Sequence, residues 1–291
     1  MLDANFPLDE EDRTFHLGAR KGEISNRILS VGDASRAELL SQAFLRPFPN
    51  GDPVFNMVSS RGFSVTTGVV GESNTEVSIV TTLMGLANMD FVVREARAVI
   101  EGPMAIVRLG TCGALQPGTL GKILVPAEGC VLVHRNPDSF NQPANGSKTK
   151  PYLITSPVYP HADLCNRLIT ELQRTLPAGP DGIKCGINCT TDSFYSSQGR
   201  TGSAFDDRNE DLMERVMEEI PNAVSFEMET FQLLHLASCS KGSIAAAACA
   251  IGLAERANNK FMTPSQLVEM EEKAGKSAIE ALVDFDLSLL D

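Results

Sequence analysis

The sequence has no run of 18 uncharged apolar residues, and this lack argues against a membrane span. Its first residues contain neither the basic segment nor the apolar stretch of a secretory signal peptide, so none is expected. Hydrophobic residues nevertheless make up 43% of the 291 residues, and charged residues make up 21%. That balance is ordinary for a globular protein and too apolar for a disordered one.

Basic residues are fewer than acidic residues. The chain has 25 Lys and Arg against 37 Asp and Glu, which gives a net charge of −12. A protein that binds nucleic acid or an anionic membrane surface needs a basic face, so we expect neither partner. A small anion can still bind, because a few well-placed arginines act locally whatever the net charge.

Cysteine and histidine form no metal or disulfide pattern. The seven cysteines are odd in number and scattered, mostly in apolar or glycine-rich contexts, which predicts buried thiols in a reducing compartment such as the cytoplasm. Cys185 and Cys189 share a segment that has no partner pair, and the four histidines are dispersed, so no metal site is expected.

Several catalytic motifs are missing as well. There is no Walker A pattern, no Gly-x-Gly-x-x-Gly after the first predicted strand, no His-Glu-x-x-His and no Gly-x-Ser-x-Gly. A Ser/His/Asp hydrolase therefore has little support from the sequence.

What the sequence does contain is an alternation of short apolar runs and helical periodicity. Buried strands are predicted at residues 28–31, 77–82, 104–110 and 122–126, and a strand is favoured over a helix at 245–251 because a Lys-Gly turn precedes it. Helices are predicted from Ser35, a plausible N-cap, and over residues 92–100, 212–220, 230–236 and 267–285. This alternation predicts an α/β fold around a largely buried sheet.

We expect one domain over residues 1–291, because the composition shows no sharp break and no internal repeat. Residues 1–14 are expected to be an N-terminal extension. Residues 134–151 are polar and rich in Pro, Asn and Ser, which predicts a loop insertion.

Three glycine-containing turns follow predicted strands, at Gly32, Gly85 and Gly110. Ligands of wound α/β sheets bind where strands end, and glycine lets backbone N–H groups approach an anion. Arg36 and Arg108 lie beside two of these turns, which favours a phosphate site. Arg108 interrupts an apolar strand and, if buried, needs an anionic partner. Arg36 has the alternative of being a solvated helix residue.

A second group consists of Phe194, Gln198 and Arg200. A planar amide beside a guanidinium offers the donors and acceptors that bind the edge of a base with carbonyls and an imide N–H. The aromatic ring could contact the same base. A plain surface loop is the alternative.

A third group, Glu227, Met228 and Glu229, precedes a predicted helix. A carboxylate has only acceptors and can bind the two hydroxyl donors of a ribose. Alternatively, the two glutamates simply complement the helix dipole.

Together and in this order, these motifs resemble the nucleoside phosphorylase-I family and, within it, the enzymes that cleave uridine. The resemblance runs from about Phe15 to the C-terminal helix. The matching segments are Phe15-His16-Leu17-Gly18, Gly32-Asp33-x-x-Arg36, Ile106-Val-Arg108-Leu-Gly110-Thr111-Cys-Gly113-Ala, Asp192-Ser-Phe194-Tyr195-x-x-Gln198-x-Arg200 and Phe226-Glu227-Met228-Glu229. The Phe-Tyr-x-x-Gln-x-Arg part points to a pyrimidine-2,4-dione.

The resemblance implies a three-layer α/β sandwich with a central mixed, barrel-like β-sheet flanked by helices. It implies reversible phosphorolysis of uridine to uracil and ribose 1-phosphate, as used in pyrimidine salvage and nucleoside catabolism. Phosphate would be a co-substrate, with no further cofactor. The protein would be at least a homodimer whose site is shared between subunits.

The resemblance also assigns roles to individual residues. Phosphate would be bound by Gly32, Arg36, Arg108 and Thr111 of one subunit and by Arg61 of its neighbour. Ribose would be bound by Met228, Glu229 and the neighbour's His16, and uracil by Phe194, Gln198 and Arg200. Glu227 and Arg256 are possible further pocket residues, Arg256 as a residue that closes the pocket.

Departures from the family pattern leave alternatives open. Purine-specific relatives often carry an Asp after the last sheet strand; Glu255 stands near that place, so a purine nucleoside phosphorylase or a nucleosidase of the same fold is an alternative. An inward-pointing Asp90 would oppose phosphate, which leaves a non-catalytic nucleoside-binding paralogue open. Gly62 replaces the Glu with which some bacterial relatives bind a monovalent cation, so no such site is expected.

Overall fold

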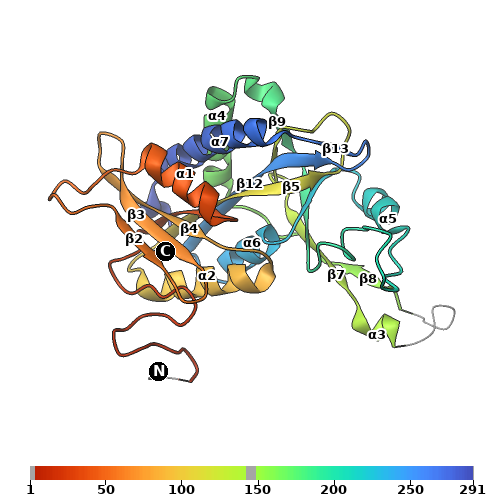
Figure 1. The fold of residues 1–291 in the computed structure, drawn as a ribbon, viewed down its shortest axis with the longest axis horizontal. Coiled ribbons are helices and arrows are strands. Elements are labelled where there is room, and N and C mark those ends of the chain that lie inside the picture. The colour runs from red at the N-terminus through yellow and green to blue at the C-terminus, as the bar shows by residue number, and fades with distance from the viewer. Residues whose placement is uncertain (1–3, 142–148, 291) are drawn as a thin grey trace.

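The computed structural model describes residues 4–141 and 149–290 (Figure 1). The strands within these ranges are β1 (Arg27–Val31), β2 (Phe55–Val58), β3 (Ser64–Val70), β4 (Thr75–Thr81), β5 (Met104–Ala114), β6 (Ile123–Val125), β7 (Cys130–Arg135), β8 (Tyr152–Ile154), β9 (Ile183–Cys185), β10 (Ile187–Thr191), β11 (Ala223–Glu227), β12 (Ile244–Glu255) and β13 (Lys260–Phe261). The helices are α1 (Ala34–Phe44), α2 (Leu86–Val99), α3 (Pro137–Phe140), α4 (Ala162–Thr175), α5 (Leu212–Glu219), α6 (Thr230–Ser238) and α7 (Pro264–Asp284).

The strands form one mixed sheet in the order β2-β3-β4-β1-β5-β11-β10-β7-β8, with β12, β6, β9 and β13 on a branch. Strands β4, β1, β5 and β12 are mutually parallel, so their carboxyl ends meet at one edge of the sheet. The long strand β5 pairs with β1 and β12 along most of its length and with antiparallel β11 at its end. This arrangement brings the end of β11 to the same edge.

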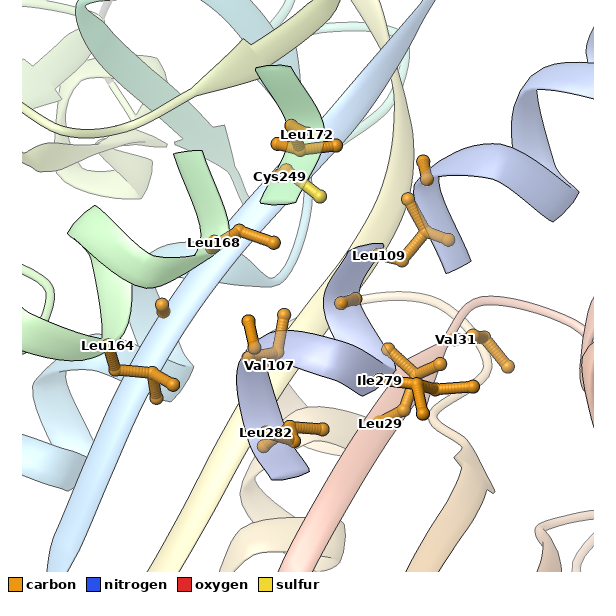
Figure 2. Packing of buried hydrophobic residues seen from close by; sticks show 14 of the residues in the cluster. Leu29, Val31, Val107, Leu109, Leu164, Leu168, Leu172, Cys249, Ile279 and Leu282 are labelled. Atoms are coloured by element: carbon orange, nitrogen blue, oxygen red, sulfur yellow. The ribbon is translucent and has the colours of Figure 1, made fainter. Parts of the chain in front are cut away.

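Helices cover both faces of the sheet, as Figure 1 shows. Alternate residues of the central strands face opposite cores, because successive side chains of a strand point to opposite faces. On one face, Leu29 and Val107 pack with α1, α4 and α7. Figure 2 shows the part of this packing that α4 and α7 make. On the other face, Ile28 and Ile106 pack with α2 and α6. The expected α/β sandwich with a central mixed sheet is confirmed.

The predicted N-cap of α1 is wrong. Asp33, not Ser35, caps the helix: its backbone is extended, and its side chain accepts a hydrogen bond from the backbone N–H of Arg36 at 2.9 Å. Ser35 lies inside the first turn and donates its hydroxyl to Asp33. Both residue types are good caps, and the carboxylate is the one that precedes the helix.

Helix α4 has no counterpart among the predicted helices, although Leu164, Leu168 and Leu172 form its buried stripe. The expected loop insertion 134–151 begins with the end of β7 and the one-turn helix α3; its residues 142–148 lie outside the described residues, as do residues 1–3 of the expected extension. Within the described ranges, no helix combines the length and apolarity that crossing a bilayer requires.

Candidate active site

A cavity of about 490 Å³ opens at the edge where the carboxyl ends of the parallel strands meet. The structure brings into its lining ten residues that the sequence singled out: Gly32, Arg36, Arg108, Thr111, Phe194, Gln198, Arg200, Glu227, Met228 and Glu229. They come from four separate stretches of the chain, which the sheet brings together.

Arg108 lies at the centre of the sheet, with β1 on one side of it and β12 on the other. The residue is 4% exposed. Its Nη2 donates to a carboxylate oxygen of Glu229, and its Nε lies 3.8 Å from an oxygen of Glu227. Neither Nε nor Nη1 has a hydrogen-bond partner among the described residues. A buried donor without a partner costs roughly 1–3 kcal/mol, so these two groups favour an anion in the cavity.

Arg36 is also buried, so it is not the solvated helix residue that the sequence left open as an alternative. Its Nη1 donates to the carbonyl oxygen of Leu109 at 3.2 Å, and its Nη2 lies 3.2 Å from a carboxylate oxygen of Asp33. Its Nε donates to Glu271 at 2.7 Å. A guanidinium has five N–H donors, so two remain available toward the cavity that Arg36 lines.

Glu227 has its carboxylate occupied by neighbouring protein groups. It accepts hydrogen bonds from the side chains of Asn188 and Thr190 and from the backbone N–H groups of Glu229 and Thr230. These bonds cap the start of α6 and fix the backbone of Glu229. Glu227 lines the cavity, but its acceptors already have donors, so its part is structural support.

Glu229 is the carboxylate whose contacts face the cavity. Its oxygens accept from the backbone N–H of Gly85 at 2.5 Å and from Arg108. Burial raises the pKa of Glu229 above its usual range and neighbouring Glu227 adds to this effect, while Arg108 opposes it. A buried acceptor with two donors can still receive hydroxyl groups, because an ionised carboxylate offers about four lone-pair sites.

The turn that supplies the N–H of Gly85 has an unusual backbone. Leu83 has a φ of 56° and Gly85 a φ of 95°. A left-handed leucine is rare and costs energy, and such residues cluster at functional sites. The sequence predicted that this turn aims an N–H at an anion, and the anion it meets in the structure is the carboxylate of Glu229.

Gln198 and Arg200 lie side by side, with Nη2 of Arg200 3.4 Å from Oε1 of Gln198. Gln198 is 2% exposed, and its Nε2 donates to the hydroxyl of Thr191 at 3.0 Å. The guanidinium of Arg200 lies 3.9 Å from the centre of the Phe194 ring, and its Nε donates to the carbonyl oxygen of Phe194. The segment is therefore an ordered wall of the cavity and more than a solvated loop.

Arg256 lies behind this wall. Its Nη1 and Nη2 donate to the backbone carbonyl oxygens of Gln198 and Gly199, at 2.6 and 3.3 Å. Its pKa is lowered, first by burial and then by the charge of Arg200. Arg256 thus holds the backbone of this wall in place and does not itself line the cavity.

Glu255 and Asp90, the two acidic residues on which the alternative functions depended, both have their carboxylates bound outside the cavity. Glu255 accepts from the backbone N–H groups of Gly118 and Thr119, at 2.7 and 3.2 Å, and from Asn258. Asp90 pairs with Arg94 at 3.0 Å on α2. Neither side chain lines the cavity.

Asp90 also accepts a hydrogen bond from Gln232 of α6, at 2.8 Å. Its carboxylate therefore links α2 to α6, and it does not oppose an anion at Arg108.

His16 and Arg61 do not line this cavity. His16 holds Nδ1 2.7 Å from Glu95 and stacks on Phe91 with ring centroids 3.7 Å apart. The Arg61 guanidinium lies 4.9 Å from the ring centre of Phe15. The Phe15 ring also lies 4.9 Å from the His16 ring, so both residues contact Phe15. The assignment of His16 and Arg61 to a neighbour's site stays a prediction.

Sequence reasoning missed part of the lining: Asp33, Ala34, Leu83, Met84, Cys112, Gly113, Phe226, Leu253, Ala254 and Phe261. Most are apolar residues at strand ends, where apolarity signals a core position and gives no hint of a pocket. In the part of the chain that the structure describes, no three His, Cys, Asp or Glu side chains gather in a way that could hold a metal ion.

Comparisons with known proteins identify the family of this chain. A family described as the Phosphorylase superfamily matches residues 26–285. A uridine phosphorylase of Thermococcus kodakarensis is 25% identical over 264 residues, which cover 89% of this chain and 84% of its own. A DeoD-type purine nucleoside phosphorylase of Geobacillus kaustophilus is 38% identical over 105 residues, 35% of this chain and 39% of its own.

Among solved structures, one from a study of two uridine phosphorylases of the oomycete Phytophthora capsici superposes with a TM-score of 0.87. It is 37% identical to this chain, and the match covers 97% of each chain. Uridine and purine enzymes thus both occur among the relatives.

Proposed function

The chain belongs to the phosphorylase superfamily as a nucleoside phosphorylase, and from that premise we propose that it catalyses the reversible phosphorolysis of uridine to uracil and ribose 1-phosphate. One observation carries the proposal. The cavity is lined by Arg108, whose buried Nε and Nη1 have no hydrogen-bond partner among the described residues, and also by the Gln198 and Arg200 pair. It therefore offers a place for an anion and a place for a pyrimidine-2,4-dione within one hollow.

At the anion end, Arg108 and Arg36 bind phosphate, with Thr111 and the backbone at Gly32 as further donors. Glu229 binds the ribose hydroxyls beside Arg108. A phosphate oxygen attacks C1′ of the ribose as the bond from C1′ to N1 of uracil breaks. Positioning the nucleophile and placing its negative charge near the cationic sugar lower the barrier.

At the base end, the electron pair of the broken bond leaves with uracil and spreads over its ring and carbonyl oxygens. Arg200 donates to the base where this charge develops. Gln198 offers an acceptor to the imide N–H and a donor to a carbonyl. These charge-matched donors make a separate general acid unnecessary, and the reaction needs no cofactor or metal beyond phosphate as co-substrate.

A second copy of the chain completes the site. Arg36 and Arg108 share their surroundings with four carboxylates, those of Asp33, Glu227, Glu229 and Glu271. In one chain alone, the carboxylates around the phosphate site thus outnumber the two arginines, which disfavours an anion. We propose a homodimer in which the neighbour's Arg61 adds positive charge and the neighbour's His16 binds the ribose 5′-hydroxyl.

The contacts of Glu255 support uridine over a purine nucleoside. Phosphorolysis of a purine benefits from an acid near N7 of the base. Glu255 is held by backbone N–H groups, and its pKa is lowered, first by its hydrogen bond with Asn258, so it is a poor proton donor. The partial match to a purine enzyme nevertheless makes purine nucleosides a necessary part of the test.

The test is turnover of uridine, inosine and adenosine, each with and without phosphate. We expect uridine to be cleaved only with phosphate, and the purine nucleosides at least about 10²-fold more slowly, since Glu255, the candidate acid, is bound outside the cavity. Cleavage that ignores phosphate would indicate a nucleosidase, and faster cleavage of inosine a purine phosphorylase. Binding without product would indicate a non-catalytic paralogue. Each of these results contradicts the proposal.

A further inference from the structure

The phosphate end of the cavity has a residue behind it that no family motif suggested. Glu271 of α7 is buried, and its Oε1 accepts a hydrogen bond from Nε of Arg36 at 2.7 Å. The two side chains are 10% and 5% exposed and are separated by 235 residues in the sequence. Glu271 does not line the cavity, so its contact with Arg36 is made from outside the site.

Glu271 occupies a position that the helix would otherwise fill with an apolar residue. The buried residues of α7 include Glu271, Ala274, Ala278 and Leu282, which is the spacing of a core-facing helix stripe. A carboxylate in that stripe is costly to bury unless it is paired. Its pairing with a guanidinium explains how the fold tolerates it.

The packing of α7 against α1 sets the geometry of this pair. Gly275 lies so close to Leu40 of α1 that a Cβ at position 275 would come within 2.3 Å of the leucine side chain. Arg36 precedes Leu40 by four residues, and Glu271 precedes Gly275 by four. The ion pair therefore lies about one helical turn from this close contact between the two helices.

The remaining contacts of Arg36 complete the restraint. Nη1 is held by the carbonyl oxygen of Leu109 and Nη2 by Asp33, so each of the three nitrogens has one protein partner. Two of the five N–H donors remain, one on each Nη. Glu271 holds Nε and so helps to fix the guanidinium plane at the cavity that Arg36 lines.

We propose that Glu271 is a positioning residue for phosphate, which acts by fixing the guanidinium of Arg36. The inference rests on the proposed function, because it assumes that Arg36 binds phosphate. Glu271 contributes orientation and no attraction, since its own charge opposes an anion. Its loss must therefore weaken phosphate binding if orientation matters more, and strengthen it if charge matters more.

The experiment measures KM for phosphate and KM for uridine in Glu271→Ala, with Glu272→Ala, at an exposed neighbour on the same helix, as the matched control. We expect KM for phosphate to rise about tenfold in Glu271→Ala, the effect of losing one charged hydrogen bond, with KM for uridine within about twofold. Glu271→Gln keeps an acceptor for Nε and should stay within about threefold of the parent protein in both constants.

A double variant separates positioning from general support of the fold. Because Glu271 acts through Arg36, adding Glu271→Ala to Arg36→Ala should raise KM for phosphate no further than Arg36→Ala alone. A fall in KM for phosphate, no change in it, or an equal rise in both KM values would overturn the proposal.

Calorimetric titration with inorganic phosphate keeps this proposal distinct from the proposed function. If the parent protein cleaves no nucleoside but binds phosphate, the proposed function fails, and the tenfold weaker binding expected for Glu271→Ala still tests the inference. If the parent protein does not bind phosphate at all, the inference fails too.

Discussion

Replacing Arg108 by alanine is expected to lower kcat/KM for uridine phosphorolysis by about 10³-fold, equivalent to roughly 4 kcal/mol of lost transition-state stabilisation. Arg108 lines the cavity, and two of its buried nitrogens have no hydrogen-bond partner in the described part of the chain. It also joins the phosphate end of the site to Glu229, the proposed ribose ligand. Its removal therefore takes away a phosphate contact and leaves a buried carboxylate without its cation.

Two further variants make this result interpretable. Arg108→Lys keeps the positive charge but loses the planar fork of donors, so we expect an intermediate loss of about 10²-fold. Arg94→Ala, which removes an arginine that is 62% exposed on α2, should leave turnover unchanged. Thermal unfolding of each variant shows whether the protein remains folded at the assay temperature. Near-normal turnover of a folded Arg108→Ala protein would rule out the phosphate site described here.

Replacing Arg200 by alanine is expected to slow uridine phosphorolysis by about 10²-fold, the usual cost of removing one donor to a developing negative charge. Arg200 is well placed for this role because its guanidinium is fixed against the Phe194 ring and beside Gln198. The mutation should leave binding of phosphate nearly unchanged, since phosphate is bound by the other arginines.

The dependence on the leaving group tests why Arg200 matters. A 5-fluoro substituent withdraws electrons and stabilises the departing uracil anion by itself. The loss of rate caused by Arg200→Ala should therefore be smaller for 5-fluorouridine than for uridine, by a factor of about five or more. Equal losses for both substrates would mean that Arg200 orients the base and does not stabilise its charge.

The sequence was informative where local pattern and chemistry agree. The apolar runs before Gly32 and Gly110 predicted the parallel strands β1 and β5, because such strands are buried on both faces and lack alternation. The turn predicted at Gly110 is wrong, since β5 continues through it to Ala114. Arg108 could be identified as a site residue because a charge inside a buried strand needs a partner. The location of the site could also be predicted, because the carboxyl ends of neighbouring parallel strands lie at the same edge of a sheet.

Contacts between residues far apart in the chain could not be predicted from the sequence. Nothing local reveals that Glu229 meets both Arg108 and Gly85, since these contacts depend on how β11 returns to the end of β5. The ribose role of Glu229 and the supporting role of Glu227 separate only when their hydrogen-bond partners are known.

Some signals were present and unused. A glutamate in the apolar stripe of α7 could have drawn attention to Glu271, because a buried carboxylate demands a cation. Competition between Asp33 and Ser35 for the cap of α1 could not be decided from type alone, since both are good caps. His16 and Arg61 carry no signal in composition or periodicity and depend on the family resemblance.

The most direct test of the central claim is a crystal structure of the protein with uracil and sulfate, sulfate standing in for phosphate. We expect sulfate oxygens within hydrogen-bond distance of Nε or Nη1 of Arg108 and of Nη1 or Nη2 of Arg36, and uracil paired with Gln198 and Arg200 in the same cavity. Sulfate and uracil in separate places, or uracil absent from the Gln198 wall while both ligands are at saturating concentration, would contradict the account.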